Sequence, residues 1–187
     1  MNKQCVIPAL PLVANADPVE RLASLFETHY DRLYRLARRL APNADDALDL
    51  VQETFLKAAR HPKSIPAGES NEEAWLVRVL INLRRDQWRK ISVRARPQTV
   101  ALLSSRSENG RRSPEEELIA KTAVWQALDV LPPRRRAIVV MHEIEDLPIS
   151  NIASLLGISA ITVRWHLSMG RRDLARALKA SEGVTHE

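Results

Sequence analysis

Hydrophobic residues recur along most of this chain at spacings of three and four, the pattern of amphipathic helices. The first run follows Asp17-Pro18-Val19-Glu20, which combines an N-cap aspartate with a proline at the first helical position. The pattern predicts a long helix that begins near residue 17 and ends before Pro42. Its apolar face comprises Leu22, Leu25, Phe26, His29, Leu33, Leu36 and Leu40.

Two more helices are expected in the first half of the chain. Asn43 can cap a helix that runs to about Arg60 and is stopped by Pro62. Its buried face comprises Ala47, Val51, Thr54, Phe55 and Ala58. After a loop over residues 63–69, a capping box at Ser70-Asn71-Glu72-Glu73 predicts the start of a third helix, which is apolar for three turns and then becomes basic.

The basic end of the third helix suggests nucleic-acid chemistry. Between Arg78 and Arg96 the chain carries seven Arg or Lys residues and a single acid, Asp86. Aromatic side chains among cations suit single-stranded nucleic acid, because bases stack on the rings while the cations contact phosphates. We expect Trp75 to belong to the core and Trp88 to be partly exposed.

Residues 91–112 lose the helical periodicity and are rich in Arg, Ser, Asn and Gln, which predicts a flexible linker. Ser113-Pro114-Glu115-Glu116 then signals a new helix, closed by Leu131-Pro132-Pro133. A further short helix is expected from Arg134 to Glu145, with three residues inward: Ile138, Met141 and His142.

The stretch Ile149–Leu178 has the pattern of a helix-turn-helix. A short apolar helix leads to Gly157, where a left-handed helix end costs little, and Ser159 can cap the helix that follows. The opposite face of that second helix carries Arg164, His166, Arg171, Arg172 and Arg176. A basic second helix after a glycine turn is typical of motifs that enter the DNA major groove. The alternative is an ordinary helical hairpin with a solvated basic face.

A polar face of the second helix offers another candidate surface. Asp49, Gln52, Glu53 and Leu56 recur there at spacings of three and four. They could form a simple solvated acidic face. Because an apolar side chain lies among the polar ones, they could equally form a docking surface for a basic partner helix.

Composition narrows the class of protein. The 187 residues have a formal net charge of +5 and a single cysteine, Cys5, which favours polyanionic partners and excludes an intrachain disulfide. We predict an all-α chain of two small helical domains joined by a flexible linker, without catalytic constellation, metal site or cofactor. Residues 1–16 loosely imitate a signal peptide, but Pro8 and Pro11 interrupt the apolar run, so a disordered tail is expected.

Read together, the two halves resemble the bacterial sigma-70 family, and the short two-part layout resembles its extracytoplasmic-function subgroup. Residues 25–90 are similar to sigma region 2 through YDRLYRLARRL, DLVQETF and AWLVRVLINLRRD. Residues 124–178 are similar to region 4 through ALDVLPPRRRAIVVMHEIEDLPISNIASLLGISAITVRWHL. The resemblance implies a non-enzymatic, cytoplasmic subunit of RNA polymerase that recognises and melts promoter DNA and commonly has an anti-sigma factor. Expected domains are 17–90, a linker at 91–112, and 113–180, with tails at 1–16 and 181–187.

The resemblance also implies roles for particular residues. The core-polymerase docking positions are Asp49, Gln52, Glu53 and Leu56. The segment that melts and reads the minus-ten element contains Arg78, Asn82, Arg85, Trp88, Arg89 and Lys90. The helix that reads the minus-thirty-five element contains Ser159, Ala160, Thr162, Arg164, Trp165, His166 and Arg171.

Departures from the family pattern affect promoter choice rather than role. Pro148 and Asn151 replace the usual capping pair before the first helix of the motif, and Met169 replaces a frequent basic residue. Ala160 and Ile161 make the start of the second helix less polar than usual. A stand-alone DNA-binding regulator and a decoy that sequesters an anti-sigma protein remain as competing interpretations; the retained Arg164, Arg171 and basic segment at 84–90 argue against the decoy.

Overall fold

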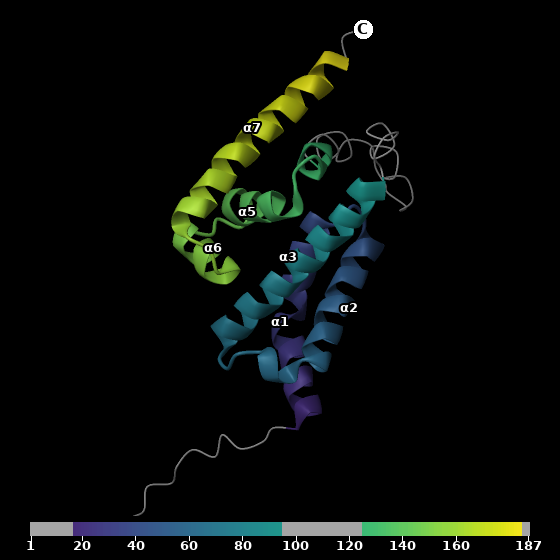
Figure 1. Cartoon of the computed structure of the whole chain (residues 1–187), viewed down its shortest axis with the longest axis vertical. Coiled ribbons are helices and arrows are strands. Elements are labelled where there is room, and N and C mark those ends of the chain that lie inside the picture. Colours follow the sequence, from purple (N-terminus) through teal and green to yellow (C-terminus); the bar gives the residue numbers. More distant parts are fainter. Residues whose placement is uncertain (1–16, 95–124, 185–187) are drawn as a thin grey trace, which may run out of the picture.

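The computed structural model describes residues 17–94 and 125–184, and every regular element in these ranges is helical. The helices of the first half are α1 (Pro18–Leu40), α2 (Ala44–Arg60) and α3 (Glu69–Arg94), with a short 3₁₀ turn, η1, at Pro62–Ser64. Those of the second half are α5 (Pro133–Glu143), α6 (Ile149–Leu156) and α7 (Ala160–Val184), preceded by helical residues at 125–129. The all-α prediction is confirmed for this part of the chain (Figure 1).

The helix boundaries follow the local capping signals at four places. The Asp17 side chain accepts a hydrogen bond from the amide of Val19 at 3.1 Å, and that of Asn43 accepts one from the amide of Asp46 at 2.7 Å. Gly157 ends α6 in the left-handed conformation, with φ of 63°. The Ser159 hydroxyl then accepts from the amide of Thr162 at 3.1 Å and so starts α7. These caps confirm the predicted helix starts and the tight turn.

The predicted capping box of the third helix is wrong. The helix begins at Glu69, so Ser70 lies inside its first turn. The carbonyl of Gly68 accepts from the amides of Asn71 and Glu72 at 2.9 Å each, which makes Gly68 the N-cap residue of the helix. The φ of Gly68, 96°, suits glycine and turns the chain into the helix.

Four other boundaries differ from the predictions. The helix expected from Arg134 to Glu145 runs from Pro133 to Glu143. The loop expected at 63–69 contains part of η1, and α3 continues to Arg94, into the predicted linker. The end expected to fray from Ser181 stays helical to Val184. The expected tail at 1–16, the linker at 95–112 and the helix start at Ser113 lie outside the described residues.

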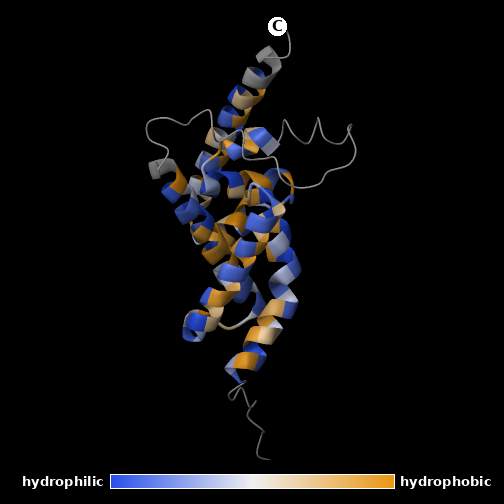
Figure 2. Cartoon of the chain, turned by 90° about the vertical axis from the view of Figure 1, so that its right-hand side faces the viewer, coloured by the Kyte–Doolittle hydropathy of each residue, from blue (hydrophilic) through white to orange (hydrophobic). Residues whose placement is uncertain are grey.

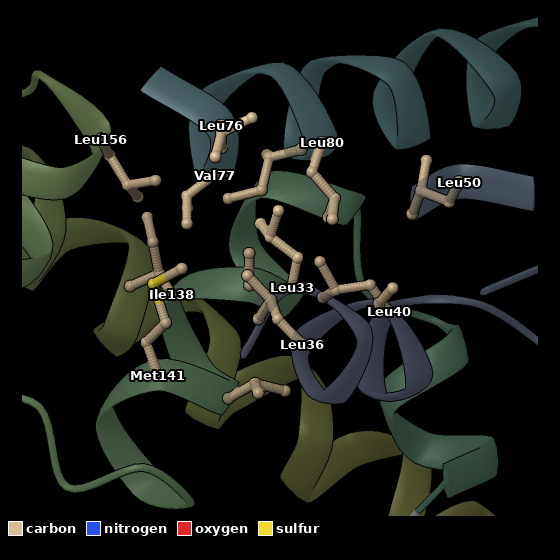
Figure 3. Close-up of a cluster of buried hydrophobic side chains, with 14 of the residues drawn as sticks. Leu33, Leu36, Leu40, Leu50, Leu76, Val77, Leu80, Ile138, Met141 and Leu156 are labelled. Atoms are coloured by element: carbon tan, nitrogen blue, oxygen red, sulfur yellow. The ribbon is translucent and has the colours of Figure 1, made fainter. Parts of the chain in front are cut away.

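The two halves of the chain share one hydrophobic core. Helices α1, α2 and α3 pack together, and α5 and α6 lie against α3 and α1 (Figure 1). Figure 3 shows Ile138 and Met141 of α5 and Leu156 of α6 beside Val77 of α3. Figure 2 shows hydrophobic positions concentrated in the middle of the molecule. The two halves are therefore not separate bodies in this structure but lie directly against one another.

Polar contacts accompany this apolar interface. Arg39 of α1 forms an ion pair with Glu145, which follows α5, at 2.6 Å. The carbonyl of Arg39 also accepts a hydrogen bond from Nε of Arg136 at 2.7 Å. Arg136 is buried and forms an ion pair with Asp129, and burial lowers the pKa of its guanidinium. A buried guanidinium requires hydrogen-bond partners, and one of the partners of Arg136, the Arg39 carbonyl, belongs to the other half of the chain.

Helices α5 and α7 approach closely at Gly170. A Cβ atom at that position would lie 2.5 Å from Cγ2 of Val139 and 3.3 Å from Cγ of Arg135. We therefore expect Gly170→Ala to destabilise the protein by about 1–3 kcal/mol, because overpacking outweighs the better helix propensity of alanine. Urea denaturation followed by circular dichroism measures this. Ser168→Ala, at an exposed position of the same helix, is the control, and equal stabilities of the two variants would contradict the packing argument.

No single helix in the described ranges is long and apolar enough to cross a membrane. Helices α6 and α7 pass that test of length and composition only as a pair bent by 107°.

Candidate nucleic-acid and partner-binding surfaces

A groove between α2 and α3 gathers the four candidate docking residues. Asp49 and Gln52 are exposed, Leu56 is 48% exposed, and Glu53 is half-buried. Its lining comprises Asp49, Gln52, Glu53, Leu56, Lys57, Leu83, Asp86, Gln87 and Lys90. The structure thus brings the predicted residues together and adds a wall contributed by α3.

Burial of the opposite face of α2 forces these residues outward. Val51, Thr54 and Phe55 pack into the core, and at 3.6 residues per turn the face with Gln52 and Leu56 must point away. An apolar side chain surrounded by carboxylates and amides can bind an amphipathic helix. The apolar stripe of the partner helix packs on the leucine, and its cations pair with the carboxylates. Within the described ranges Glu53 forms one long, exposed ion pair, with Arg60 at 3.9 Å, so its carboxylate can accept hydrogen bonds from a partner.

The basic segment of α3 is partly exposed. Asn82, Arg89 and Lys90 are exposed, whereas Arg85 and Trp88 are half-buried. Lys90, which was predicted as a minus-ten residue, also lines the groove between α2 and α3. Trp75 packs against the core, as predicted.

Two other arginines of α3 face the interior of the molecule. Arg84 is buried and donates from Nε to the carbonyl of Leu40 at 2.9 Å, so it holds α3 against α1. Burial, followed by the nearby Arg136, lowers the pKa of Arg84. The half-buried Arg78 lies against the turn of the helix-turn-helix, since a Cβ atom at Gly157 would be 3.1 Å from its Nη1. In this arrangement Arg78 is partly covered by the second half of the chain.

The first half of α7 presents a mixed polar and apolar face. Ser159, Ile161, Arg164 and Trp165 are exposed, while Ala160 and Thr162 are half-buried. Val163 and Leu167 are buried against α5 and α6, which fixes the orientation of the helix. The start of α7 therefore presents Ser159, Ile161, Arg164 and Trp165 to solvent.

Two predicted residues of α7 are engaged within the molecule. Arg171 donates to Oε1 of Glu143 from Nε at 3.0 Å and from Nη2 at 2.7 Å. His166 is half-buried, and its Nδ1 has no hydrogen-bond partner. Burial, followed by the charges of Arg134 and Arg135, lowers the pKa of His166. His166 therefore belongs to the contact between α5 and α7 rather than to the open basic face.

Two basic residues beside this face were not predicted as binding residues. Arg134 and Arg135 lie in the first turn of α5, close enough to His166 to lower its pKa. Arg135 also forms an ion pair with Asp173 of α7 and lies over the ring of Trp165. The sequence did contain a signal for these two residues. A helix that starts with proline and carries cations in its first turn can be read from Pro132-Pro133-Arg134-Arg135-Arg136. Among the described residues, no group of His, Cys, Asp and Glu side chains could hold a metal ion.

Comparison with known families finds a separate match for each half of the chain. Residues 25–94 match Sigma-70 region 2, and residues 121–174 match Sigma-70, region 4. The chain is 36% identical over 153 residues to the ECF RNA polymerase sigma factor SigE of Mycolicibacterium smegmatis. That alignment covers 80% of this chain but 58% of the relative. This chain is also 33% identical over 165 residues to the RNA polymerase sigma-E factor of Streptomyces coelicolor. That alignment covers 83% of this chain and 90% of the relative.

Solved structures show the same fold across both halves. The sigma factor RpoE from Bartonella quintana, solved in complex with the anti-sigma factor NepR, has a TM-score of 0.61 and 22% identity, covering 86% of this chain and 98% of that one. CnrH, in complex with the cytosolic domain of CnrY, has a TM-score of 0.56 and 23% identity, covering 85% of this chain and 88% of that one. The chain therefore belongs to the sigma-70 family of RNA polymerase sigma factors, in the extracytoplasmic-function subgroup.

Proposed function

We propose that this sigma factor, which directs promoter-specific transcription initiation, divides the task among three surfaces. The groove of α2 and α3 docks on core RNA polymerase, the basic end of α3 opens and reads the minus-ten element, and α7 reads the minus-thirty-five element. In this division residues 17–90 form one functional domain, 113–180 the other, and 91–112 the linker.

The groove between α2 and α3 is the observation that carries the docking proposal. An exposed leucine rimmed by Asp49, Gln52 and Glu53 suits a basic amphipathic helix better than it suits DNA, whose phosphates the carboxylates would repel. A stand-alone regulator needs no such surface. The groove therefore favours a polymerase subunit over that alternative.

The basic end of α3 suits a strand that is already opening. Separating DNA costs about 1.4 kcal/mol per stacked base pair step, so a protein must hold the released bases to offset that cost. Trp88 offers a partly exposed ring, Asn82 an amide for base edges, and Arg89 a cation for phosphates. The other residues proposed for the minus-ten element are Arg78, Arg85 and Lys90.

For the minus-thirty-five element, Arg164 is the test residue because it is exposed on α7. We expect Arg164→Ala to weaken promoter binding by the holoenzyme about fivefold or more, because a bidentate arginine–guanine contact is worth about 1–3 kcal/mol. Binding to core polymerase should not change. Filter binding of holoenzyme to promoter fragments, beside co-elution with core enzyme, measures both. Unchanged promoter affinity and unchanged promoter choice would overturn the assignment of α7.

The two halves must separate to use a whole promoter. The minus-ten and minus-thirty-five elements lie 25 positions apart, or about 85 Å along B-form DNA at 3.4 Å per base pair. In the structure Gly157, in the turn before α7, lies beside Arg78 of α3, one of the residues proposed for the minus-ten element. We therefore propose that binding to core polymerase replaces the contacts between the halves.

Other aspects of the proposal follow from this role. We propose that the chain acts in the cytoplasm, where the polymerase and promoter DNA are, and performs no catalysis of its own. An anti-sigma factor is a further expected partner, because the RpoE relative was solved with one. We propose that such a partner competes for the docking groove or stabilises the closed arrangement.

A further inference from the structure

The exposed face of α7 carries an apolar ridge. Ile161 is 75% exposed and Trp165 is 54% exposed. They are four residues apart, so they lie on the same side of the helix, one turn from each other. Isolated exposed hydrophobic residues are common on proteins, but neighbouring ones that form a continuous apolar patch mark an interaction site.

The ring of Trp165 is held in place by its neighbours. Cζ of Arg135 lies 5.7 Å from the ring centroid, on the face of the indole. The ring of His166 meets it edge-on, with centroids 4.9 Å apart and planes at 70°. Arg135 is itself fixed by its ion pair with Asp173. A side chain restrained before binding loses less conformational entropy on contact, so the ridge is organised in advance.

Thymine is the base that such a ridge fits. In the major groove, base edges present hydrogen-bond donors and acceptors, and the C5 methyl of thymine is the apolar group among them. Ile161 has no polar side-chain atom, and the indole of Trp165 offers a donor only. Arg164, between them in sequence, supplies the polar contact. The ridge therefore complements a methyl group next to a polar base edge.

We propose that Trp165, together with Ile161, reads a thymine methyl group in the minus-thirty-five element, and that Arg135 is a positioning residue that holds the indole. This inference rests on the proposed function of α7 as the recognition helix. It adds a specificity-determining contact that depends on shape and apolar surface instead of hydrogen bonds.

The experiment begins with holoenzyme made from the full chain. Duplexes with a randomised minus-thirty-five region are selected for binding, and each selected thymine is then replaced by deoxyuridine, which removes the methyl group alone. We expect one thymine at which this replacement weakens binding about fourfold, the equivalent of about 0.8 kcal/mol for one buried methyl-sized group. Trp165→Ala should bind both duplexes equally. Arg164→Ala should bind more weakly overall and keep the fourfold ratio.

Arg135 is tested by a conservative pair of variants. Arg135→Lys keeps a cation over the indole and a partner for Asp173, so the methyl ratio should be retained. Arg135→Met keeps an unbranched side chain of similar shape without the charge, so the ratio should fall toward one. Circular dichroism shows whether both variants keep the helical fold.

The outcomes separate this inference from the function on which it rests. Selection of a defined sequence with no methyl dependence would overturn the inference alone, as would a methyl ratio that survives Trp165→Ala. If Trp165→Ala left DNA selection unchanged but removed co-elution with core polymerase, the ridge would be a protein contact and the inference wrong. Failure of the wild-type holoenzyme to select any sequence would overturn the proposed role of α7 and the inference with it.

Discussion

Replacing Gln52 and Glu53 with alanine is expected to abolish binding to core RNA polymerase while the helical fold stays intact. Both residues belong to the groove of α2 and α3, where they surround Leu56. Removing charged or polar groups from the centre of an interface costs about 3 kcal/mol or more, which is over a hundredfold in Kd. Fluorescence titration of labelled protein with core enzyme measures the loss.

The fold should survive this change because neither side chain contributes to the core. Gln52 is exposed, and the ion pair of Glu53 with Arg60 is exposed and long, so stability should change by about 0.5 kcal/mol or less. A double variant of α1, Glu27→Ala with Asp31→Ala, removes two exposed carboxylates elsewhere and serves as the control. Normal core binding by the groove variant would contradict the docking assignment. If the control variant lost as much affinity for core polymerase, the loss would be a general effect of charge and not of the groove.

The second large effect concerns the closed arrangement of the two halves. Glu145→Arg replaces the ion pair with Arg39 by a repulsion between like charges at a partly buried site. We expect a loss of about 1–2 kcal/mol of contact free energy, which shifts the ratio of closed to open molecules by about 5- to 30-fold. Small-angle X-ray scattering should show a larger radius of gyration. Energy transfer between dyes on α2 and α7 should fall.

Two further variants make this prediction specific. Glu143→Arg changes the net charge equally, but Glu143 pairs with Arg171 of α7 within the same half of the chain, so the halves should stay together. Adding Arg39→Glu to Glu145→Arg restores an attractive pair and should restore the compact form. Identical scattering from all variants would show that the pair does not hold the halves together. Opening by Glu143→Arg would show that net charge, not this contact, is responsible.

Local signals made several elements predictable. The caps at Asp17, Asn43 and Ser159 each depend on a side chain and an amide two or three residues away, so the sequence contains everything that decides them. The third helix shows where this fails. The capping box predicted the start at Ser70, whereas Gly68, at a positive φ, precedes the first residue of the helix and its carbonyl accepts the first helical hydrogen bonds.

Contacts between distant segments could not be predicted in the same way. Periodicity indicates that a face is buried but not which helix covers it, so the ion pair of Arg39 with Glu145, 106 residues apart, gives no sequence signal. His166 illustrates the same limit within α7. Its spacing put it on the basic face, whereas packing beside α5 leaves it half-buried, and burial lowers its pKa.

The α2 side of the docking groove was predictable from the sequence, and the α3 side was not. Spacing of three and four residues placed Asp49, Gln52 and Leu56 on one face of a helix, and the structure confirms that they share a surface. The second wall, from Leu83 to Lys90 of α3, required knowledge of how α3 packs on α2. Lys90, predicted for DNA alone, is therefore also a neighbour of the docking residues.

Docking of this chain on RNA polymerase through the groove of α2 and α3 is tested most directly by size-exclusion chromatography. The purified protein is run with bacterial core RNA polymerase, beside the Gln52→Ala, Glu53→Ala variant. We expect the wild-type protein to elute with the core enzyme and the variant, equally helical by circular dichroism, to elute alone. Separate elution of a folded wild-type protein would contradict a polymerase subunit. Co-elution of both proteins would place the docking surface elsewhere on the molecule.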